Sequence, residues 1–290
     1  MATIHELKDR LASVRSAEKI TTALQMVASS KLKKAAHITE RFVPFKQMIQ
    51  QMLDDFLNSD REIDTPFTRS RSIKHVTFVA FSSNIGFCGS FNNVIIERLK
   101  SEIGKYPNIG KRVVCVGDKV LHAVSRLVPS LEYESWSKLV ERPDYQETKR
   151  LADYLVDLYL KQQTDKVILI YFRFKNSLIH ELKVLDFLPL VIPETNDNKK
   201  SLLHLFILEP PAEKLLSQLM PKVFRSIIYA ATLDSFSSEQ GARTMAMQQA
   251  SDNARNLQET LSIDLNRQRQ QQITTEILEL DASAEDDNGF

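Results

Sequence analysis

The sequence predicts an α/β fold that combines a long antiparallel coiled coil of the N- and C-terminal helices with a Rossmann-like α/β globular domain, whose sheet is mainly parallel. Apolar residues recur every three or four positions at both ends of the chain, which is typical of long helices with one buried face. In the middle, short β-branched and aromatic runs alternate with helical segments, and five of the seven glycines fall there. The predicted parts are an N-terminal helix over 1–57, a globular domain over 75–208, a C-terminal helix over 212–281 and an acidic tail over 282–290.

The N-terminal helix is predicted from an apolar seam. Its positions step by threes and fours along the chain: Ile4, Leu7, Leu11, Val14, Ala17, Ile20, Leu24 and Val27, then Phe42, Phe45, Ile49, Met52 and Phe56. Pro44 lies inside this seam. Because proline lacks a backbone N–H and its ring clashes with the preceding turn, we expect a kink or a local break there.

The middle of the chain predicts an alternation of strands and helices. Five apolar runs are expected to be strands, at 75–81, 112–117, 166–174, 178–187 and 203–208. Helices are expected at 91–104, 118–127 and 145–163. Strands separated by helices form parallel sheets, whereas two adjoining runs predict an antiparallel hairpin, with its turn at 175–177. Polar connectors are expected at 58–74 and 193–200.

The C-terminal helix carries a second seam, through Leu215, Leu219, Val223, Ile227, Ala230, Ala250, Ala254, Leu257, Leu261, Leu265, Ile273, Ile277 and Leu280. Two such helices at the ends of one chain are expected to pair as an antiparallel coiled coil. If Leu57 lies near Ala212, the numbers of facing residues sum to roughly 268, because both helices rise equally per residue. Leu24 then faces residues 243–245, and the second helix continues past Ile4 by about 17 residues.

The acidic ending predicts where this second helix stops. Four carboxylates follow Leu280, at Asp281, Glu285, Asp286 and Asp287. Negative charge is unfavourable at a helix C-terminus, so we expect the helix to end near Leu280.

Composition limits the possible partners. A formal charge of +1 offers no global field that would attract nucleic acid, so no nucleic-acid partner is expected and binding should be local. The cysteines, Cys88 and Cys115, form no CxxC motif, which fits a reducing compartment, and the start of the chain has no pattern of a signal peptide. Residues 76–96 are uncharged, but their glycines and polar side chains argue against a membrane span.

One stretch of the N-terminal helix stands out because residues 20–30 carry no charge, whereas charges are frequent on both sides. Most of its side chains are short, and Met26 is an adaptable apolar group. Such a surface suits contact with changing neighbours; the alternative is that Met26 belongs to the coiled-coil core. The cluster Lys31, Lys33 and Lys34 follows immediately, and a solvated helix face is the simplest interpretation of each single lysine.

Four motifs carry a resemblance to a known family. The segments "KITTALQMVASSKLKKA" (19–35), "GFCGSFN" (86–92), "SSEQGARTMAMQQASDNA" (237–254) and "ITTEILEL" (273–280) are similar, in this order, to the gamma subunit of the rotary (F-type) ATP synthase. The resemblance implies a central-stalk rotor subunit without an active site, metal or cofactor. The implied partners are the alpha and beta subunits, the epsilon subunit and the c-ring, at the cytoplasmic side of the bacterial inner membrane.

The resemblance also implies which residues meet partners. The lysine cluster is implied to lie opposite an acidic loop of the beta subunit. The guanidinium of Arg243 is implied to form bidentate hydrogen bonds to a neighbouring subunit. The end of the second helix is implied to contact the inner wall of the ring of alpha and beta subunits. The residues expected at partner contacts are Thr22, Leu24, Met26, Lys31, Lys33, Lys34, Arg243, Met245, Thr274, Glu276, Ile277 and Leu280. The ending "DASAEDDNGF" departs from the small apolar ending usual in the family.

Two other functions have some support. The loop at 82–92 follows a strand and precedes a helix, where phosphates often bind, yet it has neither GxGxxG nor GK[ST]; tight packing is expected to explain Gly86 and Gly89. The six histidines show no spacing typical of metal ligands. The alternative function is a coiled-coil tether or chaperone with a globular α/β head.

Overall fold

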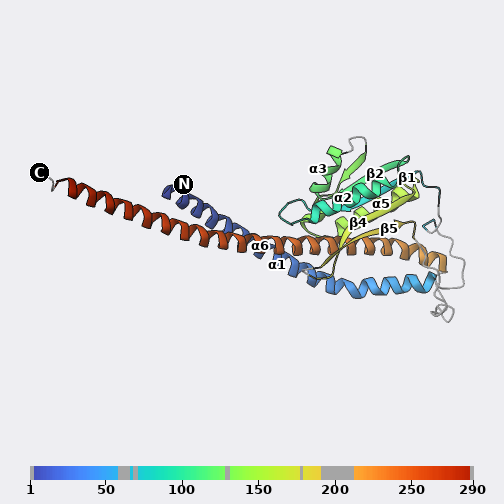
Figure 1. Cartoon of the computed structure of the whole chain (residues 1–290). Helices are drawn as coiled ribbons and strands as arrows, with labels where there is room; N and C mark the ends of the chain where they lie inside the picture. Colours follow the sequence, from blue (N-terminus) through green and yellow to red (C-terminus); the bar gives the residue numbers. More distant parts are fainter. Residues whose placement is uncertain are drawn as a thin grey trace. The chain divides into compact units, whose positions relative to one another are not determined.

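The computed structural model describes residues 3–57, 66–67, 71–127, 131–176, 179–190 and 212–287, without the side chains at 57, 127, 212–213 and 279–287 (Figure 1). Two compact units make up the chain. Unit 1 consists of Met1–Val27 and Thr244–Phe290, and unit 2 consists of Ala28–Arg243. Two long helices, α1 (Ile4–Leu57) and α6 (Ala212–Asp287), contribute residues to both units.

Unit 1 is an antiparallel pair formed by the first part of α1 and the last part of α6. The start of α1 is fixed by a capping box, in which the Glu6 N–H donates to Oγ1 of Thr3 at 3.2 Å and the Thr3 N–H donates to the Glu6 carboxylate at 2.9 Å. Leu7, Leu11 and Leu261 form a small apolar cluster between the helices. The predicted antiparallel coiled coil is therefore present in this unit.

The register of the pair differs from the expected one. Thr22 faces Ser251 with their hydroxyl oxygens 2.8 Å apart, and the Gln25 amide donates to Gln248, so the numbers of facing residues add to 273 instead of roughly 268. Leu24 therefore lies at the level of Gln249 and not of residues 243–245. The predicted register was wrong because it assumed that Leu57 lies near Ala212. Within unit 2, Phe56 and Leu219 line one groove, so the part of α6 opposite the end of α1 lies more than one turn after Ala212.

Both long helices also run past residues that were expected to interrupt or end them. No break interrupts α1 at Pro44, and Ile49, Leu53 and Phe56 beyond it are buried, so tertiary packing outweighs the cost of the proline. The end of α6 is Asp287 rather than Leu280. Repulsion between a carboxylate and the helix dipole costs only about 0.3 to 1 kcal/mol and is screened, and residues such as Ala282 and Ala284 favour the helix.

Unit 2 contains a five-stranded sheet in the order β3-β2-β1-β4-β5, in which β5 is antiparallel to β4 and the other pairs are parallel. The mainly parallel sheet and the hairpin are therefore confirmed. Its elements are β1 (His75–Phe81), α2 (Phe91–Gly104), β2 (Gly110–Val116), α3 (Asp118–Leu127), β3 (Glu132–Ser135), α4 (Lys138–Glu141), α5 (Tyr145–Leu160), β4 (Lys166–Phe174) and β5 (His180–Leu188). The expected strand at 203–208 lies outside the described residues, as do Ser177 and most of both connectors.

Each face of the sheet packs against its own core. Phe78, Val113 and Ile168 point to one face and join the buried apolar side chains of α2 and α3. Their neighbours Val79 and Val114 point to the other face and join α5, α6 and the last turns of α1. Burial on both faces explains why β1 and β4 are nearly continuous apolar runs in the sequence.

No helix in the described ranges is both long and apolar enough to cross a membrane. The uncharged stretch at 76–96 forms β1, a loop and the start of α2, as expected.

Candidate partner-binding surfaces

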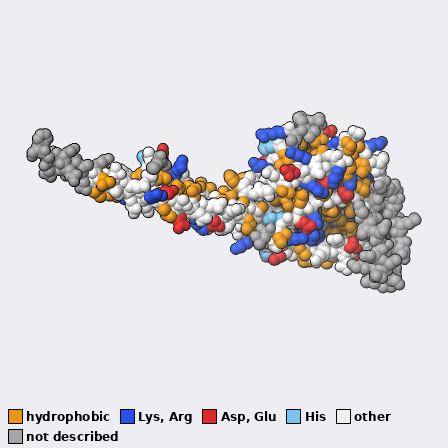
Figure 2. Space-filling model, in the orientation of Figure 1, with side chains coloured by type: hydrophobic (Ala, Val, Ile, Leu, Met, Phe, Trp, Pro, Cys, Tyr) orange, Lys and Arg blue, Asp and Glu red, His pale blue; other side chains and the backbone are white. Residues whose placement is uncertain are grey.

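The first candidate site is an uncharged patch on the helix pair of unit 1, made of Ile20, Met26, Val27 and Met245. Met26 is 67% exposed and Met245 is 44% exposed, so the alternative that Met26 belongs to the coiled-coil core is wrong. Exposed hydrophobic side chains are visible along this helix pair in Figure 2. Contiguous exposed apolar surface is typical of contact sites, and a contact between these side chains and a partner stays a prediction.

Polar pairs beneath the uncharged patch hold the two helices together. Thr22 and Leu24 are half-buried, and the Thr22 hydroxyl is satisfied by Ser251. Further along, Nε of Arg255 donates to the Glu18 carboxylate at 2.9 Å. The Arg255 contact is the main reason that the pKa of Glu18 lies below its ordinary value. The Thr22 hydroxyl thus contributes to the pairing of the two helices, and the expected partner contacts of Thr22 and Leu24 stay predictions.

The lysine cluster lies on the exposed side of α1 in unit 2. Lys31, Lys33 and Lys34 are all exposed, whereas Ala28 and Ala35, seven residues apart, are buried in the helix packing. This spacing places the alanines on the inner face and Lys33 and Lys34 on the outer side. Lys31, three residues after Ala28 and four before Ala35, lies near the inner face, where its charge acts on Glu239. The cluster can therefore meet an acidic partner without disturbing the packing of α1.

The last turns of α6 whose side chains are described carry three exposed apolar residues, and residues 273–278 are called the apolar end segment below. The register that pairs Thr22 with Ser251 brings Ile4 only to the level of Arg269, so this segment lies beyond the described part of α1. Its polar side chains bond within the helix: the Thr274 hydroxyl donates to the Gln270 carbonyl, and Gln272 donates to Glu276. Ile273, Ile277 and Leu278 are more than half exposed. The Leu280 side chain lies outside the described residues.

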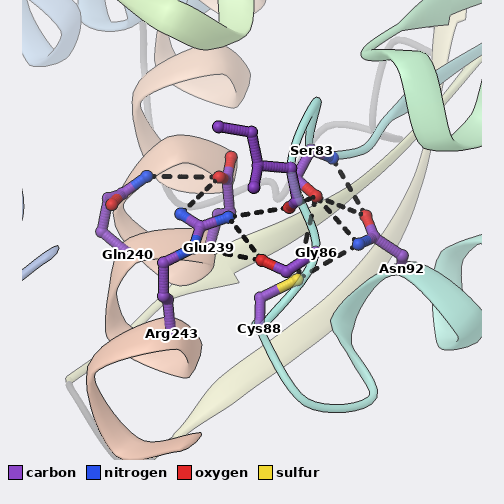
Figure 3. Close-up of polar contacts among 8 residues, drawn as sticks. Ser83, Gly86, Cys88, Asn92, Glu239, Gln240 and Arg243 are labelled. Atoms are coloured by element: carbon purple, nitrogen blue, oxygen red, sulfur yellow. Dashed lines mark hydrogen bonds and ion pairs between the residues drawn. The ribbon is translucent and has the colours of Figure 1, made fainter. Parts of the chain in front are cut away.

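A different arrangement is found at Arg243, which was expected from the resemblance to bind a neighbouring subunit. Its side chain is only 11% exposed, and its guanidinium bonds within unit 2 (Figure 3). Nη1 lies 2.8 Å from Oε1 of Glu239, Nη2 donates to the carbonyl of Ile85 at 2.9 Å, and Nε donates to the carbonyl of Gly86 at 3.3 Å. A contact between Arg243 and a neighbouring subunit stays a prediction.

The loop that Arg243 contacts, residues 82–90 between β1 and α2, is also held from inside. The Asn92 amide nitrogen donates to Oγ of Ser83 at 2.8 Å and to Sγ of Cys88 at 3.1 Å, while its oxygen accepts from the Ser83 N–H at 3.0 Å (Figure 3). Phe87 has a φ of 63° and is 66% exposed. A left-handed backbone at an aromatic residue is uncommon and needs such support.

Close packing does not explain the two glycines of this loop, contrary to expectation. A Cβ atom added at Gly86 or Gly89 would meet nothing within 4 Å. Gly89 is instead explained by its φ of 59°, which glycine adopts without strain. The close approach occurs at Gly117, where a Cβ would lie 2.4 Å from the Ser82 carbonyl oxygen.

Sequence reasoning missed Glu239, Ser83 and Asn92. Glu239 is 5% exposed, and this burial raises the pKa of its carboxyl to about 7, although Arg243, Lys31 and Gln240 oppose the shift. The available signal was the spacing of four between Glu239 and Arg243, which places them on one helix face. Glu239 and Arg243 are buried because the loop that follows β1 packs against them, and the spacing of residues along one helix does not reveal this contact.

The remaining groups that could support catalysis or metal binding are the two cysteine thiols and the His, Asp and Glu side chains. Burial raises the pKa of the Cys88 thiol, and that of Cys115 to about 12, which disfavours the reactive thiolate. Within the described ranges, no three His, Cys, Asp or Glu side chains converge so that they could hold a metal ion.

Comparison with known proteins agrees with the fold and the motifs. The family model described as ATP synthase matches residues 3–285. The chain is 38% identical to the ATP synthase gamma chain of Bacteroides fragilis over 285 residues, covering 97% of this chain and 98% of that protein. It is 32% identical to the gamma chain of Flavobacterium johnsoniae over 290 residues, covering both chains completely.

Solved structures show the same architecture. A chain of the central stalk and c-ring of the Tetrahymena thermophila mitochondrial ATP synthase is similar with a TM-score of 0.58 and 25% identity, over 80% of this chain and 99% of that one. A chain of the Euglena gracilis mitochondrial ATP synthase rotor is similar in fold, with a TM-score of 0.64 and 16% identity, over 93% and 98%. Two long terminal helices and a mainly parallel sheet are thus the fold of central-stalk proteins of ATP synthases. The chain belongs to the ATP synthase gamma-chain family.

Proposed function

We propose that this chain is the rotating central-stalk subunit that couples ion flow through a membrane c-ring to ATP synthesis or hydrolysis in a ring of alpha and beta subunits. The chain itself carries out no catalysis in this proposal. The observation that carries it is the apolar end segment, whose Ile277 is 53% exposed. Exposed apolar side chains at adjacent turns of one helix are costly in water, and a surrounding protein would bury them.

The uncharged patch suits the same role. A shaft that turns inside a ring meets several copies of a subunit in succession, and fixed ion pairs would hold it at one of them. Ile20, Met26 and Met245 provide apolar contact without such pairs, and methionine adapts to changing neighbours. The lysine cluster would supply the charged contact, to an acidic loop of the beta subunit.

Further partners and the location follow from the same role. The epsilon subunit and the c-ring would bind to unit 2, and the chain would lie at the cytoplasmic side of the bacterial inner membrane, attached through the complex. The bacterial source of the gamma chains that it resembles supports this location.

The direct test is assembly followed by hydrogen exchange. The full chain, coexpressed with alpha and beta subunits, should copurify with them, and amides of residues 270–278 should exchange fast in the isolated chain and slowly in the complex. Amides of α2, on the globular domain, serve as the control and should change little. A tether or chaperone with an α/β head is the second candidate: copurification without protection of 270–278 would favour it and contradict the rotor.

A further inference from the structure

Glu239 is a buried carboxylate whose presence the proposed rotor function does not explain. It lies on α6 in unit 2, and its side chain is 6% exposed. Burial of a carboxylate is costly unless the charge is paired. The partners are Arg243, one turn later on the same helix at 2.8 Å, and Gln240, whose Nε2 donates to Glu239 at 3.2 Å.

The charged and titratable groups that face Glu239 come from three elements. On α6 itself it faces Arg243; from α1 the charge of Lys31 acts on it; and from the loop at 82–90 it faces the thiol of Cys88, whose pKa depends on both Glu239 and Arg243. Both cationic groups favour the ionised carboxylate, whereas burial favours the neutral acid. The protonation state is therefore closely balanced.

Arg243 transmits this balance to the loop. One side of its guanidinium binds the Glu239 carboxylate, and the other side donates to the carbonyl oxygens of Ile85 and Gly86 (Figure 3). Because the guanidinium is planar and rigid, the carboxylate that aligns one edge also aligns the other. The carbonyls alone lack the negative charge that a buried guanidinium requires.

The loop at 82–90 depends on contacts with residues outside it for its conformation. Phe87 and Gly89 both have left-handed backbone conformations, and the large side chains of Ile85 and Phe87 are exposed. Asn92 fixes the base of the loop through Ser83 and Cys88, whereas Arg243 holds its tip at residues 85 and 86. Strained conformations persist only when surrounding contacts fix them.

We propose that Glu239 is a positioning residue that acts through Arg243 as a proton-sensitive latch on the loop at 82–90. When Glu239 is ionised, Arg243 is held against the carbonyls of Ile85 and Gly86 and the loop is closed. When Glu239 takes up a proton, the ion pair is lost, the guanidinium turns to solvent, and the tip of the loop opens. The change occurs near neutral pH because burial raises the pKa of Glu239 to about 7.

The native residue Cys88 can serve as a probe of whether the loop is open or closed, so no cysteine has to be introduced. Its side chain is buried while the loop is closed, and the other cysteine, Cys115, is buried in β2 and provides an internal reference. The experiment measures alkylation of each cysteine of the full chain by iodoacetamide, using mass spectrometry, from pH 6 to pH 8. Each rate is divided by that of a peptide covering residues 84–92, which corrects for thiol ionisation.

The latch predicts that the corrected rate at Cys88 is about three- to tenfold higher at pH 6 than at pH 8, since a single proton is linked to opening. Cys115 should show no such change. In Glu239→Gln the rate at Cys88 should be high and independent of pH. Arg243→Lys keeps the charge but loses the planar guanidinium, so in this variant the corrected rate at Cys88 should be raised at pH 8.

A matched control is Glu102→Gln on α2, which removes another buried glutamate held by two ion pairs, with Arg98 at 2.9 Å and Lys105 at 2.8 Å. It should keep the pH profile of the wild type at Cys88. A flat wild-type profile, or an unchanged profile in Glu239→Gln, would overturn the latch. The result does not depend on assembly of a complex, so failure of the latch would leave the rotor proposal standing.

Discussion

The hydroxyl oxygens of Thr22 and Ser251 lie 2.8 Å apart across the helix pair of unit 1. This bond fixes the register of the pair and places two polar side chains where a coiled coil usually has apolar ones. One hydroxyl donates and the other accepts in this bond.

We expect Thr22→Val to lower the free energy of unfolding of the isolated chain by about 1 kcal/mol, because the Ser251 hydroxyl loses its partner. The double variant Thr22→Val with Ser251→Ala should lose less than the sum of the two single changes. Denaturant unfolding followed by circular dichroism at 222 nm measures all three. Strict additivity would show that the two hydroxyls are not coupled.

Met26→Lys tests the uncharged patch in the assembled complex. If the patch meets several partners, as proposed, a lysine there is buried without a counter-charge, at a cost of several kcal/mol. We expect ATP hydrolysis to persist while proton pumping per ATP falls about twofold or more, since this cost is met at each step. Ser101→Lys, on the exposed face of α2, is the control and should pump normally. Normal pumping in Met26→Lys would contradict a role of the patch in coupling.

The lysine cluster should act by electrostatic attraction, which salt weakens. Changing Lys31, Lys33 and Lys34 together to Gln should reduce coupled ATP synthesis several-fold at low ionic strength and less at high ionic strength. Exposed charges more than about 10 Å apart are already largely screened at 0.1 M salt, and more salt weakens closer pairs as well. A triple Gln variant of the exposed residues Lys100, Lys119 and Lys138 controls for lost charge. If both triple variants behave like the wild type at low salt, the cluster is only a solvated helix face.

Glu239 should make stability depend on pH. In the unfolded chain its carboxyl loses the proton near 4.5, whereas in the folded chain it keeps the proton up to about 7. Between these values the folded state binds more protons, so stability should fall as pH rises from 4.5 to 7 and then level off. Relative to Glu239→Gln, the wild type should lose on the order of 2 kcal/mol across this window, as measured by denaturant unfolding at pH 5 and pH 8. An identical pH dependence in both proteins would argue against a raised pKa.

How far the sequence predicts this protein depends on whether a feature is local. The strands β1 and β4 were predicted at their observed bounds because burial on both faces makes them continuous apolar runs. The edge strand β3 was missed, since its sequence Glu-Tyr-Glu-Ser is mostly polar and exposed. The register was wrong by about five residues, because periodicity fixes which face is buried but not which turns face each other.

The same distinction applies to the candidate site. The exposure of the lysine cluster agrees with both interpretations of it, whereas the sequence left open whether Met26 is exposed or belongs to the coiled-coil core. The bonds of Arg243 to Ile85 and Gly86 join residues about 157 positions apart, and no local pattern predicts them. The resemblance to the family predicted Arg243 as important, whereas only the structure shows its partners within the chain.

Rotation itself is the most direct test of the proposed role. The full chain, carrying Ser101→Cys for attachment of a bead in a background without reactive surface cysteines, is assembled with alpha and beta subunits that are fixed to a surface. On addition of ATP, we predict that the bead turns in one direction and that rotation stops when ATP is removed. A complex that hydrolyses ATP while the attached bead stays still, with the chain demonstrably bound, would contradict it.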